Sequence, residues 1–378
     1  MVTRQYWLGR LRDAWRRRSV VWLMGARRSG KTVLSQSVAE AEYFDCELPS
    51  VRRMLRDSEA FFGERRGGAV ILDEIHRLDD PSEVLKIAAD HFPGTKVLAT
   101  GSSSLGASAR FRDTLAGRKA EVLLTPMNHA DLAAFGRFDL KHRLRNGGLP
   151  SFFLEHGFPE RDFEEWIDSY WARDIQELFR LERRHSFQKL LELLMVQSGG
   201  IFEASSLAAP CEASRPTVQN YLVALEATFV VTVVRPWHTS RAAEIVAAPK
   251  VYGFDTGFVG ALRDWQRLRP DDLGSLWEHY VLNEIRSLRP RLSPQHWRDK
   301  QKHEVEFVLR GAAGSPPVTL EAKWSAEAFD PSNLRVFRRH YPDGANYVVA
   351  QDVRRRYTRN YGDLQVHFAG IEALAGLL

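Results

Sequence analysis

The chain has 378 residues, 44% of them hydrophobic and 27% charged, which is the composition of a globular protein with two or three domains. Its formal net charge of +5 suits a nucleic-acid partner, although many enzymes share it. The two cysteines, Cys46 and Cys211, argue against a disulfide framework or a zinc site and favour a reducing cytoplasm. No apolar run approaches the roughly 18 residues of a membrane span, so we expect a cytoplasmic protein without a membrane partner.

The first predicted elements alternate between helices and strands. Residues 4–18 have the apolar spacing of a basic amphipathic helix. Three apolar runs then predict buried strands, "SVVWLMG" at 19–25, "GAVILDEI" at 68–75 and "TKVLATGSS" at 95–103. Continuous apolar strands that alternate with helices are typical of a parallel sheet covered on both faces. The sequence therefore predicts an α/β fold in its first part.

A phosphate-binding loop follows the first predicted strand. "GARRSGKT" at 25–32 is a complete G-x-x-x-x-G-K-[ST] motif that leads into a helix. Its glycines allow backbone N–H groups to surround phosphate oxygens, and the helix N-terminus adds its positive dipole end. Lys31 is placed to reach the β- and γ-phosphates of ATP, and Thr32 to bind Mg²⁺. The predicted nucleotide-binding residues of the loop are Gly25, Ala26, Arg27, Arg28, Ser29, Gly30, Lys31 and Thr32.

The second predicted strand ends in two acids, in "VILDEIH". Asp73 is expected to hold the Mg²⁺ through water, and Glu74 to orient and polarise the water that attacks the nucleotide. The alternative is an acidic strand end without catalytic function. His76 makes the stretch D-E-x-H, and we interpret it as a local surface or hydrogen-bonding histidine.

Two further residues are candidates for the same reaction. Ser102, in "LATGSSS" at the end of the third strand, is placed to sense the γ-phosphate or the water; the alternative is a serine of the strand-to-turn junction. Arg118, in "LAGR", follows another predicted helix and could reach the γ-phosphate of a neighbouring subunit. This interpretation implies a homo-oligomer, and its alternative is a surface arginine.

The middle of the chain has the layout of a winged helix-turn-helix. One helix is expected near 203–209 and a turn near 210–213, after which Ser214 could cap a second helix. Side chains at the start of that second helix would then be free to meet a DNA groove. The alternative is a module that packs only against protein. The candidate DNA contacts are Arg215, Thr217, Gln219 and Asn220.

The last part of the chain contains paired acids and a lysine. "HEVEFVL" and "EAKW" predict two strands joined by a hairpin loop at 311–317. Strand side chains alternate, so Glu304 and Glu306 share a face, Glu321 and Lys323 also share a face, and we expect these groups to lie together at one face of a small mixed sheet. Carboxylates followed by acid-x-lysine can hold a second divalent metal and orient water against a phosphodiester. A DNA-contacting domain that does not cleave and a purely structural charge cluster are equally open alternatives.

The motif order resembles that of the AAA+ ATPases, and more narrowly a prokaryotic AAA+ family with a C-terminal restriction-endonuclease-like domain of the PD-(D/E)xK type. The resemblance implies that Glu278 is the helical carboxylate of that second domain. The family usually has Asp where this chain has Glu306, and the extra methylene displaces a ligand that near-octahedral Mg²⁺ would need. The resemblance rests on "GARRSGKT", "VILDEIH", "ATGSSS", "LAGR", "NGGLP", "YWARDI", "KVYGFDTGF", "GSLWEHYVLNEI" and "HEVEFVL…EAKW".

These predictions divide the chain into an AAA+ P-loop ATPase core with a helical extension at 1–185, a winged-helix-like module at 186–250 and a restriction-endonuclease-like α/β domain at 251–378. The favoured function is Mg²⁺-dependent ATP hydrolysis by an oligomeric switch or remodeller that acts on DNA. One alternative is an ATP-regulated, metal-dependent DNA nuclease. Another is a nucleotide-dependent signalling scaffold that binds protein.

Overall fold

The computed structural model describes residues 2–101, 115–136, 139–179, 181, 183–238, 247–265, 267–311 and 315–378. The chain divides into two compact units, each interrupted in sequence. The first comprises Met1–Phe138, Leu149–Arg184 and Asn220–Val230. The second comprises Asp139–Gly148, His185–Gln219 and Val231–Leu378. Nothing in this division tests the predicted domain boundaries at 185 and 250, which stay predictions.

The first unit is built on a parallel sheet, as predicted from its apolar runs. The strands join in the order β2-β3-β4-β1-β5 and pair in parallel throughout. β4 therefore lies between β1, which leads into the phosphate loop, and β3, which ends at Asp73. The strands are β1 (Val20–Met24), β2 (Ala41–Asp45), β3 (Ala69–Asp73), β4 (Lys96–Gly101) and β5 (Lys119–Leu123).

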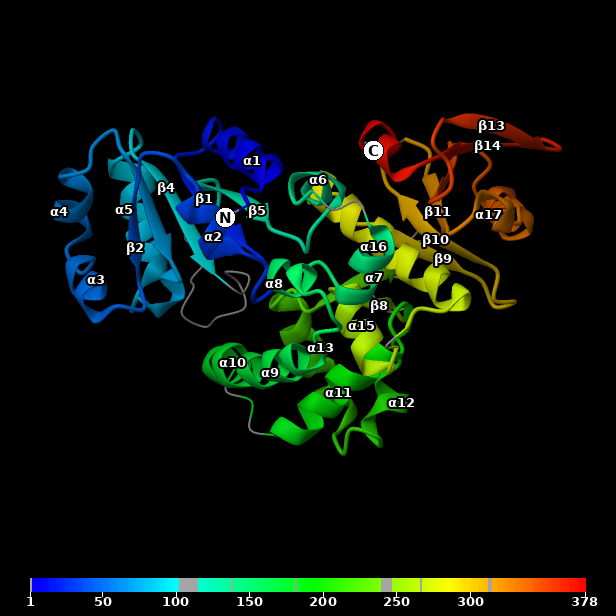
Figure 1. The fold of residues 1–378 in the computed structure, drawn as a ribbon, viewed down its shortest axis with the longest axis horizontal. Coiled ribbons are helices and arrows are strands. Elements are labelled where there is room, and N and C mark those ends of the chain that lie inside the picture. The colour runs from blue at the N-terminus through cyan, green and yellow to red at the C-terminus, as the bar shows by residue number, and fades with distance from the viewer. Residues whose placement is uncertain are drawn as a thin grey trace. The chain divides into compact units, whose positions relative to one another are not determined.

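Helices cover both faces of this sheet, which explains why its central strands are continuously apolar. Val21 and Leu23 of β1 pack against α1 and α2, whereas Val20 and Trp22 pack on the other face against α3, α4 and α5. Figure 1 shows α1 and α5 on opposite sides of the strands. The helices are α1 (Gln5–Trp15), α2 (Lys31–Gln36), α3 (Pro49–Met54), α4 (Ser58–Gly63), η1 (Ile75–Arg77) and α5 (Pro81–His91).

The remainder of the first unit is helical. It includes a short π-helix that continues α9, and π-helical turns are frequent at functional sites. These elements are α6 (His129–Ala134), α8 (Pro150–Leu154), α9 (Glu160–Tyr170), the π-helix η3 (Trp171–Ile175) and α10 (Gln176–Phe179). The long helix α13 (Arg215–Ala227) passes from the second unit into the first.

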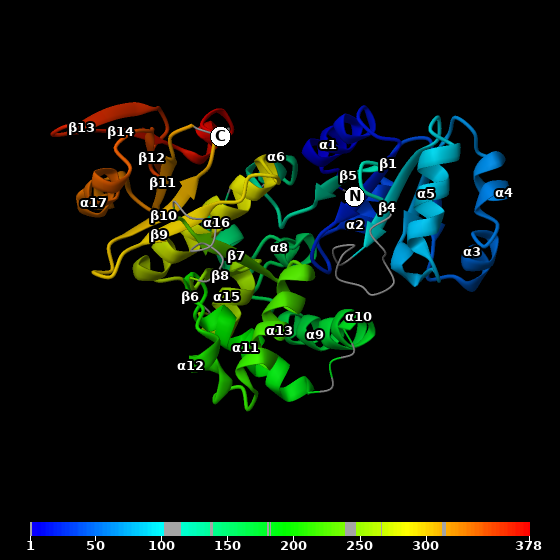
Figure 2. The ribbon, with the colours of Figure 1, turned by 180° about the vertical axis from the view of Figure 1, so that it is seen from behind.

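The second unit contains a long mixed sheet, visible from both sides in Figures 1 and 2. Its strands join in the order β13-β14-β12-β11-β10-β9-β7-β8-β6. β10 and β11 pair antiparallel, as predicted for strands that flank a hairpin loop, and β11 pairs in parallel with β12. The strands are β6 (Gly200–Ile201), β7 (Val231–Pro236), β8 (Lys250–Gly253), β9 (Gln295–Arg298), β10 (Glu304–Leu309), β11 (Val318–Lys323), β12 (Asn346–Ala350), β13 (Tyr357–Tyr361) and β14 (Leu364–Ala369).

Some helices of the second unit begin at a capping side chain, as α7 does at Asp139 and α15 at Asp255. The backbone N–H of Thr217 donates to Ser214 Oγ at 3.3 Å, which confirms the predicted cap of α13. α16 begins at Pro270, and proline is well tolerated at a first helical position. The helices are α7 (Leu140–Asn146), α11 (Arg184–Val196), α12 (Ala204–Ala208), α15 (Thr256–Leu262), α16 (Pro270–Leu288), η4 (Ala326–Ala328), α17 (Ser332–His340) and η5 (Ile371–Gly376).

Candidate nucleotide-binding site

The predicted phosphate loop joins β1 to α2, the connection that such loops require. Gly30 has φ +96°, a left-handed conformation that favours glycine, immediately before the first residue of α2. A Cβ at Gly25 would lie 2.4 Å from the Leu124 carbonyl oxygen, so a larger residue would displace the loop. Both glycines are therefore required by the backbone.

A buried ion pair fixes the loop from the protein interior. Arg4 Nη1 donates to the Ser29 carbonyl oxygen at 2.9 Å, and its Nη2 donates to Asp131 Oδ2 at 2.5 Å. The side chains of Arg4 and Asp131 are only 5% and 1% exposed. Trp7 Nε1 also donates to Asp131, at 3.1 Å. The loop is thus held by a charged contact that the sequence did not reveal.

Lys31 lies inside the loop that precedes it. Its Nζ donates to the carbonyl oxygens of Gly25 at 2.9 Å and Ala26 at 3.1 Å. Burial lowers the pKa of Lys31, and the carboxylates of Glu74 and Asp174 oppose this effect. The ammonium is therefore close to the loop backbone that is predicted to bind phosphate.

Three hydroxyl groups surround the carboxylate of Asp73. Thr32 Oγ1 donates to Asp73 Oδ2 at 2.8 Å, and the Tyr43 hydroxyl donates to the same oxygen at 2.6 Å. Thr100 Oγ1 donates to the other oxygen, Oδ1, and accepts the backbone N–H of Glu74 at 3.0 Å. Thr100 reaches both acids because β4 lies beside β3. Tyr43 and Thr100 were not among the predicted site residues.

Glu74 follows β3 in a left-handed backbone conformation, with φ +50°. Its Oε2 lies 3.2 Å from His76 Nδ1, so His76 makes the local contact expected of it. Burial acts to raise the pKa of Glu74, but His76 and the charge of Lys31 outweigh burial and lower the pKa to about 2. Glu74 is therefore a carboxylate throughout the physiological pH range.

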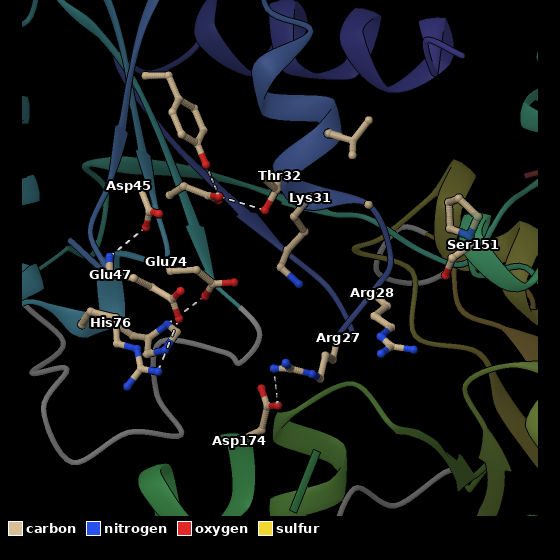
Figure 3. A pocket seen from close by; sticks show the side chains of 16 residues that line it. Arg27, Arg28, Lys31, Thr32, Asp45, Glu47, Glu74, His76, Ser151 and Asp174 are labelled. Carbon is tan, nitrogen blue, oxygen red and sulfur yellow. Dashed lines mark hydrogen bonds and ion pairs between the residues drawn. The ribbon is translucent and has the colours of Figure 1, made fainter. Parts of the chain in front are cut away.

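These residues line a cavity of about 570 Å³ (Figure 3). Lys31, Thr32, Asp73 and Glu74 contribute to its wall, together with the predicted residues Arg27, Arg28 and Gly30. Gly25, Ala26 and Ser29, which belong to the same loop, are buried. The wall also contains residues that the sequence did not assign, among them Tyr43, Ser151 and Asp174.

Of the other two predicted catalytic residues, only Arg118 belongs to the part of the chain that the structure describes. Arg118 Nε donates to Asp90 Oδ1 at 2.7 Å, and Arg118 does not line the cavity. Ser102 lies outside the described residues. Both assignments remain predictions.

The candidate DNA contacts of α13 are mostly on the surface. Arg215, Gln219 and Asn220 are exposed, whereas Thr217 is half-buried and contacts the capping Ser214. The exposed Glu212 beside this turn is paired with Lys189 at 2.5 Å. The face is therefore of mixed charge.

The acids of the C-terminal cluster are arranged around two lysines. Lys323 Nζ donates to Glu306 and, at 2.9 Å, to Glu321. Lys250 Nζ donates to Glu278 at 3.2 Å and to Glu304 at 2.6 Å. Burial acts to lower the pKa of Lys323, but the adjacent carboxylates raise it. In the part of the chain that the structure describes, no group of three or more His, Cys, Asp or Glu residues could hold a metal ion.

The second lysine was missed because it has no recognisable motif. Lys250 starts β8, more than fifty positions from Glu304 in the chain. Tyr252, on the same strand, donates its hydroxyl to Glu278. The predicted cluster thus forms two lysine-bridged carboxylate pairs, only one of which the sequence anticipated.

Comparison with known proteins supports the ATPase interpretation of the first part of the chain. Residues 17–133 match the family model described as an AAA domain. Residues 137–269 and 273–369 match two domains of unknown function, DUF8612 and DUF4143. With the phosphate-loop geometry, the first match supports an AAA-type ATPase with a P-loop core, and confirms the α/β core predicted from the sequence.

The chain is also similar to uncharacterized mycobacterial proteins. It is 29% identical over 321 residues to Rv2008c of Mycobacterium tuberculosis, covering 82% of this chain and 71% of that protein. Mb2031c of Mycobacterium bovis gives the same values. The protein MJ1544 of Methanocaldococcus jannaschii is 23% identical over 147 residues, covering 34% of this chain and 32% of that protein.

Among solved structures, the Walker-type ATPase PABY2304 of Pyrococcus abyssi aligns with a TM-score of 0.44 at 16% identity, covering 70% of this chain and 96% of that one. The STAND protein PH0952 of Pyrococcus horikoshii, which has a tetratricopeptide repeat sensor, aligns with a TM-score of 0.27 at 14% identity, covering 76% of this chain and 47% of that one. Similarity at this level carries no argument about function.

Within the described part of the chain, no helix has both the length and the apolar character needed to cross a membrane.

Proposed function

We propose that the chain binds ATP with Mg²⁺ and hydrolyses it. The observation that carries this proposal is that Lys31, Thr32, Asp73 and Glu74 come together around one cavity. The cavity volume of about 570 Å³ falls in the range of small-molecule and cofactor sites. Lysine and backbone N–H groups at a helix N-terminus suit the phosphates.

The residues present fit a magnesium ion. Mg²⁺ prefers oxygen ligands, keeps several waters and needs only one or two protein ligands beside substrate phosphates. Thr32 Oγ1 and Asp73 Oδ2, which lie 2.8 Å apart in the cavity wall, would hold it. When bound, Mg²⁺ neutralises negative charge on the β- and γ-phosphates.

Glu74 would act on the attacking water. The water oxygen forms a bond to the γ-phosphorus, and the bond between that phosphorus and the bridging oxygen breaks. The electron pair of the broken bond stays on ADP, and the proton of the water passes to Glu74 and then to solvent. Because the pKa of Glu74 is lowered to about 2, Glu74 stays ionised and can accept a hydrogen bond that orients the water.

The proposal is tested by separating nucleotide binding from turnover. Lys31→Ala should abolish tight binding of a fluorescent ATP analogue, because the ammonium is then lost from the loop. Glu74→Gln should retain binding and lose hydrolysis. Lys86→Ala, which changes an exposed lysine of α5, is the matched control and should leave both unchanged. Normal hydrolysis in both Lys31→Ala and Glu74→Gln would contradict the proposal.

We further propose that the second unit associates with DNA. The order α11-β6-α12-α13-β7-β8, with an antiparallel β7-β8-β6 sheet, supports a winged helix-turn-helix. The order α16-β9-β10-β11-α17-β12 supports a restriction-endonuclease-like fold. The exposed Arg215 and Gln219 at the start of α13, which belong to this unit, are the proposed contacts. Binding to double-stranded DNA that weakens steeply with salt would support this role, and its absence would favour a protein-binding scaffold.

Cleavage of DNA is the less favoured alternative for the same unit. Each of the four carboxylates, Glu278, Glu304, Glu306 and Glu321, accepts a hydrogen bond from a lysine. A lysine between two carboxylates offsets part of their mutual repulsion without a metal ion. Metal-dependent cutting that is lost in Lys323→Ala would reverse this preference.

A further inference from the structure

One of the two arginines of the phosphate loop, Arg27, is fixed in the wall of the cavity by a buried carboxylate. Arg27 lines the cavity with Lys31 and Glu74 (Figure 3), and its side chain is 24% exposed. Its Nε–H has no hydrogen-bond partner among the residues that the structure describes. Its charge therefore lies on the cavity wall shared with Lys31 and Glu74, where the γ-phosphate and the attacking water are proposed to lie.

Helix α9 and its π-helical continuation hold Arg27 at both ends. Arg27 Nη1 lies 3.3 Å from Oδ2 of Asp174, whose side chain is 3% exposed. Trp166 Nε1 donates to the carbonyl oxygen of Arg27 at 3.1 Å. A buried carboxylate of this kind needs a compensating partner, but it adds little stability by itself. The Arg27–Asp174 pair is therefore better explained by the need to hold the Arg27 guanidinium in one orientation.

The other arginines near the site are placed differently. Arg28 is exposed, and its guanidinium lies 5.9 Å from the ring centre of Phe152. Arg77 also lines the cavity, and its Nη2 lies 3.4 Å from Oε1 of Glu47, a partly exposed carboxylate. Arg118 is paired with Asp90 and does not line the cavity. Arg118 could therefore serve only the cavity of a second copy, whereas Arg27 serves the cavity of its own chain.

We propose that Arg27 is the catalytic arginine of ATP hydrolysis and acts within its own chain, with Asp174 as its positioning residue. The inference rests on the proposed ATPase function. Negative charge on the γ-phosphate oxygens must be stabilised as the bond to the leaving oxygen breaks, and a guanidinium fixed beside them needs no reorganisation. The Nη groups of Arg27 supply hydrogen bonds to these oxygens, whereas its Nε is buried.

This arrangement makes hydrolysis a property of the single chain. The rate per molecule should not depend on protein concentration, since no group from a second copy is needed. A trans-acting Arg118 predicts the opposite, with a rate that rises as copies associate. The concentration dependence therefore distinguishes the two arginines without any substitution.

The test compares turnover and nucleotide affinity in variants of the full chain. Arg27→Ala should lower kcat by about 100-fold or more, the cost of removing one charge-stabilising donor, while nucleotide affinity changes by less than about 10-fold. Arg27→Gln, which can still hydrogen-bond to Asp174, keeps the test valid if the alanine variant does not fold. The glutamine variant should be equally slow, because it lacks the charge.

The positioning role of Asp174 is tested by measuring kcat and KM separately and by asking whether a conservative substitution restores activity. Asp174→Asn should lower kcat by about 10-fold with little change in KM, and Asp174→Glu should recover part of the loss. Asp168→Asn is the matched control, since this exposed carboxylate also pairs with an arginine, Arg184, at 2.5 Å. The control should behave as the wild type.

Each outcome has a definite meaning. If the wild type hydrolyses ATP, and Lys31→Ala and Glu74→Gln behave as proposed, a normal kcat in Arg27→Ala or Arg27→Gln overturns this inference alone. A loss of nucleotide binding in Arg27→Ala as severe as that of Lys31→Ala also overturns it, because Arg27 would then be a binding residue. A rate that rises with concentration and is lost in Arg118→Ala places the arginine on a second copy. A wild type that does not hydrolyse ATP contradicts both the function and the inference.

Discussion

Replacing Arg4 with methionine should destabilise the phosphate loop and the sheet beneath it. The substitution removes the charge that compensates Asp131 and keeps a side chain of similar length. Asp131 is 1% exposed and would retain hydrogen bonds from Trp7 Nε1 and the Asn128 backbone N–H, both at 3.1 Å. Removing one partner of a buried ion pair costs about 3–5 kcal/mol, and the two remaining bonds place the loss near 3 kcal/mol. The opening equilibrium of this region should therefore rise about 100-fold.

Native-state hydrogen exchange at increasing urea, measured on peptides that cover β1, reports this change directly. Arg16→Met is the matched control, because Arg16 lies at the other end of α1 and its pair with Asp13 is exposed, at 79% and 62%. The control should show no measurable change. The double variant Arg4→Met with Asp131→Leu should recover part of the loss, since an apolar pair replaces the ion pair. A change below about tenfold in Arg4→Met would refute the argument.

Three further predictions concern the other parts of the molecule. The pKa of Glu74 is lowered to about 2, so its ionisation stabilises the fold fully above its ordinary pKa of 4.5 and this stability is lost as the pH falls from 4.5 towards 2. Between pH 5 and 7, the pH–rate profile should therefore show no loss of activity from protonation of Glu74. Lys250→Met should remove the lysine that bridges Glu278 and Glu304, which keep Tyr252 and Arg298 as partners, and should destabilise the second unit by about 3 kcal/mol in the same exchange experiment, with β8 peptides as the readout. Arg215→Ala should reduce the slope of log affinity for double-stranded DNA against log salt by about one, measured by fluorescence anisotropy.

The parts of the site that lie on contiguous sequence could be predicted. The phosphate loop and the acids of "VILDEIH" each need only a strand end and the residues that follow it. Tyr43 and Thr100 could not be assigned, because their roles depend on β2 and β4 flanking β3, and a sequence does not give strand order. The strand that carries Thr100 was itself predicted, but the strands that lie beside it in the sheet were not.

Ion pairs between residues far apart in the sequence also could not be predicted. Arg4 and Asp131 are 127 positions apart, and Arg27 and Asp174 are 147 apart. Each arginine resembles an ordinary member of a basic segment until its partner is known. Lys250 was missed for the same reason, since a single lysine at a strand start gives no chemical pattern. The predicted acids around Lys323 did come together, because strand alternation fixes which side chains share a face.

The central claim is that this chain hydrolyses ATP with Glu74 as the residue that activates water. The most direct measurement is the identity of the nucleotide recovered from the protein after incubation with Mg²⁺ and ATP and rapid removal of free nucleotide. We predict that the wild type yields ADP, whereas Glu74→Gln yields unhydrolysed ATP in similar amount. Recovery of ADP from Glu74→Gln at the wild-type rate, or of no nucleotide from either protein, would contradict the account.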